Sequence, residues 1–70
     1  MNIDHLVKMA NEIALFYASD SLSDAPKNIA SHLTRFWDPR MRKQIIEHNQ
    51  CGGAGLKEEV QAAIRLLVVQ

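Results

Sequence analysis

The sequence is poor in cysteine, has no long apolar run and carries no net charge. Cys51 is the only cysteine among 70 residues, so the chain cannot form an internal disulfide, whereas a small secreted domain normally carries several. No apolar run approaches the roughly 18 residues that a membrane-spanning helix needs. The first residues also lack the basic start and apolar core of a signal peptide. We therefore expect a cytoplasmic protein.

The charges balance, with 8 lysines and arginines against 8 aspartates and glutamates. A formal net charge of zero provides no overall attraction to nucleic acid or to an anionic membrane, so electrostatic recognition must come from a local cluster.

Motifs for cofactor, metal or catalytic chemistry are also scarce. His48 and Cys51 stand at helical spacing, but a zinc site would need two further ligands from other helices. The glycines of residues 52–55 lack the spacing of a phosphate-binding loop. We predict no catalytic, cofactor-binding or metal-binding residue, and no enzyme activity for the chain by itself.

The hydrophobic pattern is helical throughout. Hydrophobic residues make up 47% and charged residues 23%, which is typical of a folded globular domain. Apolar residues recur at the spacing of one helix face in four segments, and no strand pattern is visible. We predict an all-α fold, a small single-domain bundle of about four short helices. The domain spans residues 1–70, with helices near residues 3–19, 25–37, 39–50 and 56–69.

Several residues mark where these helices begin and end. Asn2 and Asp24 are candidate N-caps of the first and second helices. Asp38 precedes a proline, which disfavours helical geometry at Asp38, so the second helix should end near Trp37. The same Asp38–Pro39 pair is a typical helix start and predicts the third helix. The glycines of residues 52–55 should end the third helix.

Residues 35–43 form a basic and aromatic cluster, in which four cations against one aspartate give a net charge of +3. Arg40 and Arg42 fall in the first turn of the third helix, where a positive charge is unfavourable by roughly 0.3–1 kcal/mol. A residue that breaks a local rule often belongs to a site, and arginine suits contact with carboxylates or phosphates. The alternative is that these are solvated charges whose stems cover a small core. We predict a partner-binding surface made of Arg35, Trp37, Arg40, Met41, Arg42 and Lys43.

Three segments, taken in order and spacing, resemble the delta subunit family of NAD-dependent formate dehydrogenases. They are Leu-Val-Lys-Met-Ala-Asn-Glu-Ile at 6–13, the run from Ile29 to Arg42 that contains His-Leu-Thr-Arg-Phe-Trp-Asp-Pro-Arg-Met-Arg, and Gly-Gly-Ala-Gly-Leu at 52–56. The resemblance implies a cytosolic complex whose larger subunits hold a molybdenum cofactor, iron–sulfur clusters and flavin, while the delta subunit holds none of them. It implies an accessory role in the assembly, stability or maturation of the molybdenum-containing catalytic subunit.

Two other possibilities follow from the residues. The second and third helices, joined by a short turn, resemble a helix-turn-helix module with Arg40, Arg42 and Lys43 near the start of a recognition helix. The neutral net charge argues against binding nucleic acid. An isolated accessory subunit with an exposed apolar patch could also form a homo-oligomer.

Overall fold

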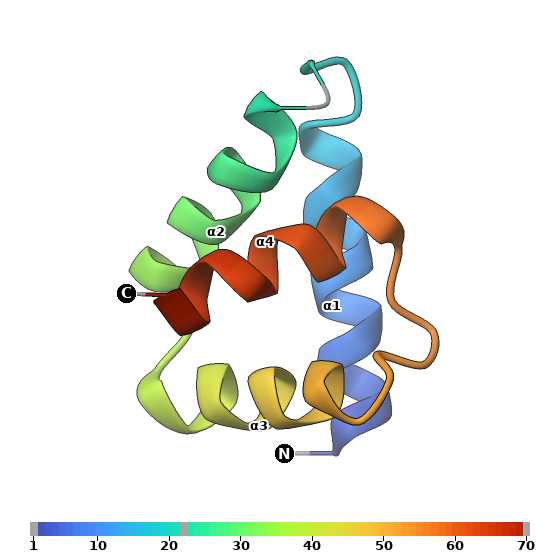
Figure 1. Cartoon of the computed structure of the whole chain (residues 1–70), viewed down its shortest axis with the longest axis vertical. Coiled ribbons are helices and arrows are strands. Elements are labelled where there is room, and N and C mark those ends of the chain that lie inside the picture. Colours follow the sequence, from blue (N-terminus) through green and yellow to red (C-terminus); the bar gives the residue numbers. More distant parts are fainter. Residues whose placement is uncertain (1, 22, 70) are drawn as a thin grey trace.

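The computed structural model describes residues 2–21 and 23–69, and within them it contains four α-helices and no strand (Figure 1). This confirms the all-α prediction. The described part measures 29 × 23 × 20 Å. The helices are α1 (Ile3–Phe16), α2 (Asp24–Phe36), α3 (Pro39–Gln50) and α4 (Glu58–Val69).

The helices α1, α2 and α3 frame three sides of the molecule, and α4 crosses in front of them (Figure 1). α1 and α2 are joined by a loop at the top of this view, and α3 lies across the bottom. α4 contacts all three of the other helices and packs most extensively on α2. Among the described residues, no helix is long and apolar enough to cross a membrane.

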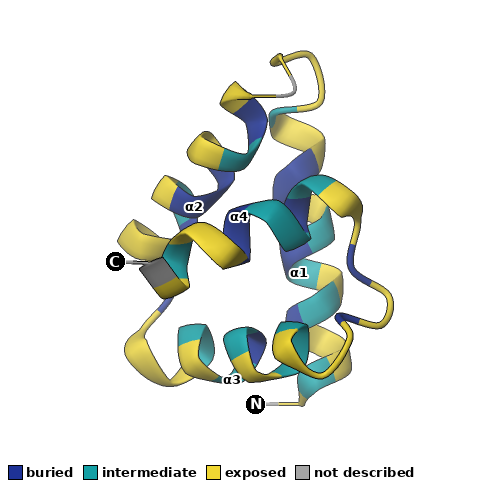
Figure 2. Ribbon diagram, in the orientation of Figure 1, coloured by how far each residue is buried: buried dark blue, intermediate teal, exposed yellow. Residues whose placement is uncertain are grey.

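The core lies where the apolar faces of the four helices meet (Figure 2). Leu6, Ile29, Leu33, Ile45, Val60 and Ile64 are its largest fully buried side chains. These residues belong to the apolar stripes that the sequence predicts, so helical periodicity identifies the inward face of each helix correctly.

Two of the predicted helix starts are confirmed by side-chain caps. The Oδ1 atom of Asn2 accepts a hydrogen bond from the backbone N–H of Asp4 at 2.7 Å. The Oδ1 atom of Asp38 accepts one from the N–H of Met41 at 2.9 Å, and Pro39 occupies the first turn of α3. Each cap satisfies a backbone donor that has no partner within its own helix.

The ends of α1 and α2 differ from the prediction by a few residues. α1 ends at Phe16 and not near residue 19, because the N–H of Tyr17 turns back to the carbonyl of Ala14 at 3.1 Å. Asp24 is the first residue of α2 and not its N-cap, since the Oγ atom of Ser21 accepts the hydrogen bond from the Asp24 N–H at 3.1 Å. Trp37 already has extended backbone, so α2 ends one residue earlier than predicted.

The loop between α3 and α4 is held against α1 by hydrogen bonds. Because the loop extends to Lys57, α4 begins at Glu58 and not at the predicted residue 56. The side chain of Asn11 donates to the carbonyl of Gly55 at 2.9 Å and accepts from the N–H of Lys57 at 3.0 Å. Gly53 has a positive φ of 64°, and its N–H bonds to the carbonyl of His48 at 3.0 Å, as expected for a glycine that ends a helix.

Candidate partner-binding surface

The basic and aromatic cluster occupies the corner where α2 ends and α3 begins. The extended backbone at Trp37 directs its indole inward, and the side chain is only 4% exposed. Trp37 is thus a core residue, whereas the neighbouring Phe36 is 70% exposed. Trp37 therefore packs into the core beneath the corner and exposes little surface to a partner.

Arg42 is bound within the molecule. Its Nη1 atom donates to the backbone carbonyl of Thr34 at 3.1 Å and to the carbonyl of Trp37. These carbonyls belong to the C-terminal end of α2, where the helix dipole favours a cation. Its bonds to α2 give Arg42 a structural role that accounts for a cation in the unfavourable first turn of α3.

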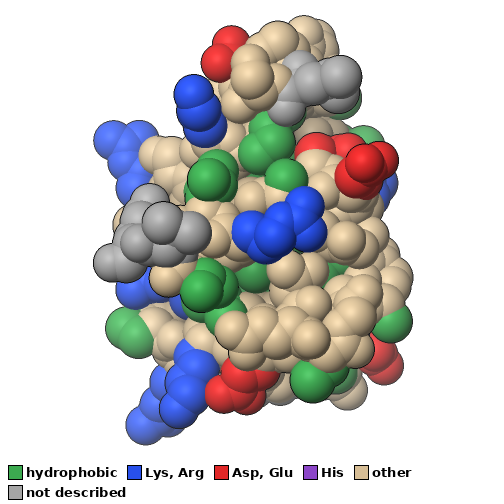
Figure 3. All heavy atoms as spheres, viewed as in Figure 1, with side chains coloured by type: hydrophobic (Ala, Val, Ile, Leu, Met, Phe, Trp, Pro, Cys, Tyr) green, Lys and Arg blue, Asp and Glu red, His purple; other side chains and the backbone are tan. Residues whose placement is uncertain are grey.

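The other cations of the cluster are free to contact a partner. The side chains of Arg35, Arg40 and Lys43 are exposed. Within residues 2–21 and 23–69 they form no hydrogen bond or ion pair. On the face shown in Figure 3, lysine and arginine side chains gather along the edge that α2 and the α2–α3 corner form. The structure thus brings several unpaired positive charges to one edge.

An open apolar groove of about 360 Å³ lies beside this corner. Its lining comes from α1, α2, Trp37 and the start of α3, and among the described residues α4 does not contribute. The lining residues are Met9, Glu12, Ile13, Phe16, His32, Phe36, Trp37 and Met41.

Exposed aromatic rings form the walls of the groove. Phe16 is 80% exposed and Phe36 70%, which is unusual for side chains of this size on a small domain. The ring of His32 lies 4.6 Å from the ring of Phe36 and 6.5 Å from that of Tyr17, measured between centroids. The ring of His32 therefore lies between that of Phe36 on α2 and that of Tyr17, the residue that follows α1.

Sequence reasoning missed most of this groove. Met41 is the residue of the predicted surface, besides Trp37, that lines it, and Met41 is half-buried. Phe16, His32 and Phe36 were not predicted as site residues. The available signal was that Phe16 is a large apolar residue that stands outside the periodic apolar stripe of the first helix.

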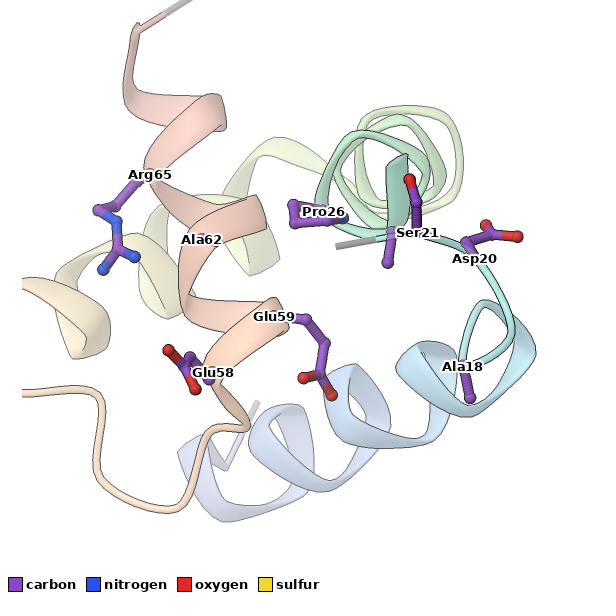
Figure 4. A pocket seen from close by; sticks show the side chains of 9 residues that line it. Ala18, Asp20, Ser21, Pro26, Glu58, Glu59, Ala62 and Arg65 are labelled. Atoms are coloured by element: carbon purple, nitrogen blue, oxygen red, sulfur yellow. The ribbon is translucent and has the colours of Figure 1, made fainter. Parts of the chain in front are cut away.

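A second cavity of about 440 Å³ lies between the start of α4 and the α1–α2 loop (Figure 4). It includes Glu58 and Glu59, whose carboxylates extend in different directions, as expected for adjacent helical residues. Among the described residues, no group of three histidine, cysteine, aspartate or glutamate side chains could hold a metal ion. Both glutamates lie in the first turn of α4, where acidic side chains complement the helix dipole.

Comparison with known proteins gives one family. The family model described as NADH-dependent formate dehydrogenase delta subunit FdsD matches residues 5–64 of the 70. No curated protein and no solved structure matched the chain. The matched range includes α1 from its third residue, all of α2 and α3, the glycine loop, and the groove and corner described above. Since the match covers most of the sequence, the chain belongs to the formate dehydrogenase delta subunit family FdsD.

Proposed function

We propose that this chain is a non-catalytic accessory subunit that binds the larger subunits of a cytoplasmic NAD-dependent formate dehydrogenase. The partner in this proposal is the molybdenum-containing catalytic chain, and the binding serves assembly, stability or maturation of that chain. The chain itself holds no cofactor in this proposal. The observation that carries it is the exposed aromatic groove beside the unpaired cations of the α2–α3 corner.

The chemistry of this surface suits binding to a protein. Phe16 and Phe36 expose large apolar rings to water. A partner that covers these rings removes their apolar surface from water, and this favours binding. Arg35 and Arg40 add charged groups able to form bidentate bonds with carboxylates. Aromatic residues and arginine are the residue types that dominate binding energy at protein interfaces.

The small size of the domain gives a second reason to expect a partner. A core of this size stabilises a fold only weakly, because its apolar burial barely exceeds the entropy lost on folding. A partner that binds only the folded chain adds to its stability by mass action. Association with a larger subunit would therefore raise the free energy of unfolding of this chain.

The helix-turn-helix alternative has one supporting observation, since Arg40 and Lys43 are exposed one turn apart near the start of α3. Arg42, however, is engaged with α2 and is not available for a phosphate. A salt-dependent mobility shift with duplex DNA would support this alternative, and the absence of a shift at low salt would exclude it.

The test is co-expression of the tagged chain with the catalytic chain of its host's formate dehydrogenase, followed by affinity purification. We expect the catalytic chain to co-purify with the wild-type chain and to be lost from the double variant Arg35→Glu/Arg40→Glu. The matched control is Lys27→Glu/Arg65→Glu, which reverses two exposed cations outside the cluster and should retain the partner. Failure of the wild-type chain to retain the catalytic chain would refute the proposal.

A further inference from the structure

The rims of the aromatic groove carry opposite charges. Glu12 lines the groove from α1. On the other side, Arg35 stands three positions after groove-lining His32 on α2, so the two side chains are neighbours on the surface of that helix. Arg40 is exposed in the first turn of α3, at the corner beside the groove. The groove therefore has an apolar floor, an acidic side and a more strongly basic side. A bound segment with its own charges would be favoured in one orientation.

The backbone around the groove offers little to an extended peptide. Peptides that bind as strands add to an exposed sheet edge, and the described residues contain no strand. The carbonyls of Thr34 and Trp37 at the end of α2 already accept hydrogen bonds from Arg42. Affinity must then come from side chains, and a helix presents side chains while satisfying its own backbone groups.

The groove has a volume suited to anchoring side chains. At about 360 Å³ it lies near the lower end of the roughly 300–1,000 Å³ of typical ligand pockets, and its lining is mostly apolar. Phe16 and Phe36 form walls from two different helices, with His32 packed against Phe36. A large apolar side chain entering between them would cover both rings.

From these three observations we infer that the groove receives an amphipathic helix of the catalytic subunit, with large apolar anchors and an acidic flank. The apolar anchors enter between Phe16 and Phe36, and the acidic flank faces Arg35 and Arg40, away from Glu12. This inference rests on the proposed function, because it takes the catalytic subunit as the partner. It adds which surface of this chain is used and what kind of segment is recognised.

Site-specific photo-cross-linking identifies the bound segment directly. Phe36 and, in a second variant, Phe16 are replaced by p-benzoylphenylalanine, the complex with the catalytic chain is purified and irradiated, and the cross-linked peptide is identified by mass spectrometry. We expect both positions to cross-link to one acidic amphipathic helix of the catalytic chain. The matched control places the same group at Leu66, which is 37% exposed on α4 and outside the groove, and should not reach that helix.

The outcomes separate this inference from the proposed function. A cross-link to a basic or non-helical segment, or to a second copy of this chain, overturns the inference. Absence of a cross-link from both groove positions, while the catalytic chain still co-purifies, also overturns it and leaves the accessory role standing. If the catalytic chain does not associate at all, the proposed function fails, and the inference fails with it.

Charge reversal gives an independent measurement on the same complex. Arg35→Glu/Arg40→Glu should weaken binding of the catalytic chain by about tenfold or more, and should remove most of the salt dependence of the association rate. Glu12→Arg should change binding by much less than Arg35→Glu/Arg40→Glu, because the acidic flank faces away from Glu12. An effect of Glu12→Arg as large as that of the double variant, with an unchanged circular dichroism spectrum, would contradict the proposed orientation of the helix.

Discussion

The guanidinium of Arg42, in the first turn of α3, donates a hydrogen bond of 3.1 Å to the backbone carbonyl of Thr34, near the end of α2. The same nitrogen also bonds the carbonyl of Trp37. One side chain thus joins the two helices across the corner formed by Asp38 and Pro39. The arginine holds the corner together, and this leaves Arg35, Arg40 and Lys43 as the cations of the cluster that a partner can use.

Replacing Arg42 by alanine should destabilise the domain. The variant leaves two carbonyls at the end of α2 without their charged donor, and we expect a loss of about 1–3 kcal/mol in the free energy of unfolding. Urea unfolding followed by Trp37 fluorescence measures this, since Trp37 is the only tryptophan and is buried. Arg40→Ala is the control, and should change stability by less than about 0.5 kcal/mol. Equal effects of the two variants would contradict the assignment.

Replacing Asn11 by alanine should release the loop between α3 and α4. Both polar atoms of the Asn11 amide bond the loop, at Gly55 and Lys57, so the variant loses two hydrogen bonds worth roughly 0.5–1.5 kcal/mol each. Hydrogen exchange at the backbone amide of Lys57 should accelerate more than exchange at the amides in the middle of α2. Gln50→Ala, at an exposed position, should leave both rates unchanged.

Replacing Gly53 by alanine should strain the same loop in two separable ways. The positive φ of 64° is costly for a residue with a Cβ, by about 1–3 kcal/mol. The added Cβ would also lie 2.7 Å from the Oδ1 atom of Asn49. A double-mutant cycle with Asn49→Ala isolates the closest contact, because Asn49→Ala removes it and leaves the backbone strain and the longer contact with the Gln61 side chain at 3.2 Å. We expect Gly53→Ala to lower the free energy of unfolding by less in the Asn49→Ala background than in the wild-type background. An equal loss in both backgrounds would show that Asn49 moves to relieve the contact.

Local signals predicted most of the fold. Asn2, Asp38 and the glycines act on backbone groups within a few residues, so their effects are readable from sequence. The helix ends at Phe16 and Phe36 were less readable, since they depend on how the chain turns into each loop. Trp37 shows the consequence: helical periodicity cannot choose between Phe36 and Trp37 as the core residue when the helix has already ended at Phe36.

The candidate site was only partly predictable for a similar reason. The cluster of cations is visible in the sequence because its members are neighbours along the chain. The partner of Arg42 is set by the angle between α2 and α3, which periodicity does not specify. The groove joins Phe16 and Phe36 from two helices, and no spacing rule brings together residues that are 20 positions apart.

Leu33 and Phe36 give the clearest separation between folding and binding, because they are close in sequence on α2 and opposite in exposure. Leu33 is fully buried, so Leu33→Ala should cost about 2–5 kcal/mol of stability, enough to unfold much of such a small domain. Phe36 is 70% exposed, so Phe36→Ala should cost less than about 1 kcal/mol. Binding should depend on Phe36 although stability does not. Among folded molecules, the Phe36→Ala variant should bind the catalytic chain at least several-fold more weakly than the wild-type chain does. Urea unfolding and a binding titration on the same preparations measure both quantities. A Phe36→Ala variant that stays folded and binds as tightly as the wild-type chain would remove the groove from the interface.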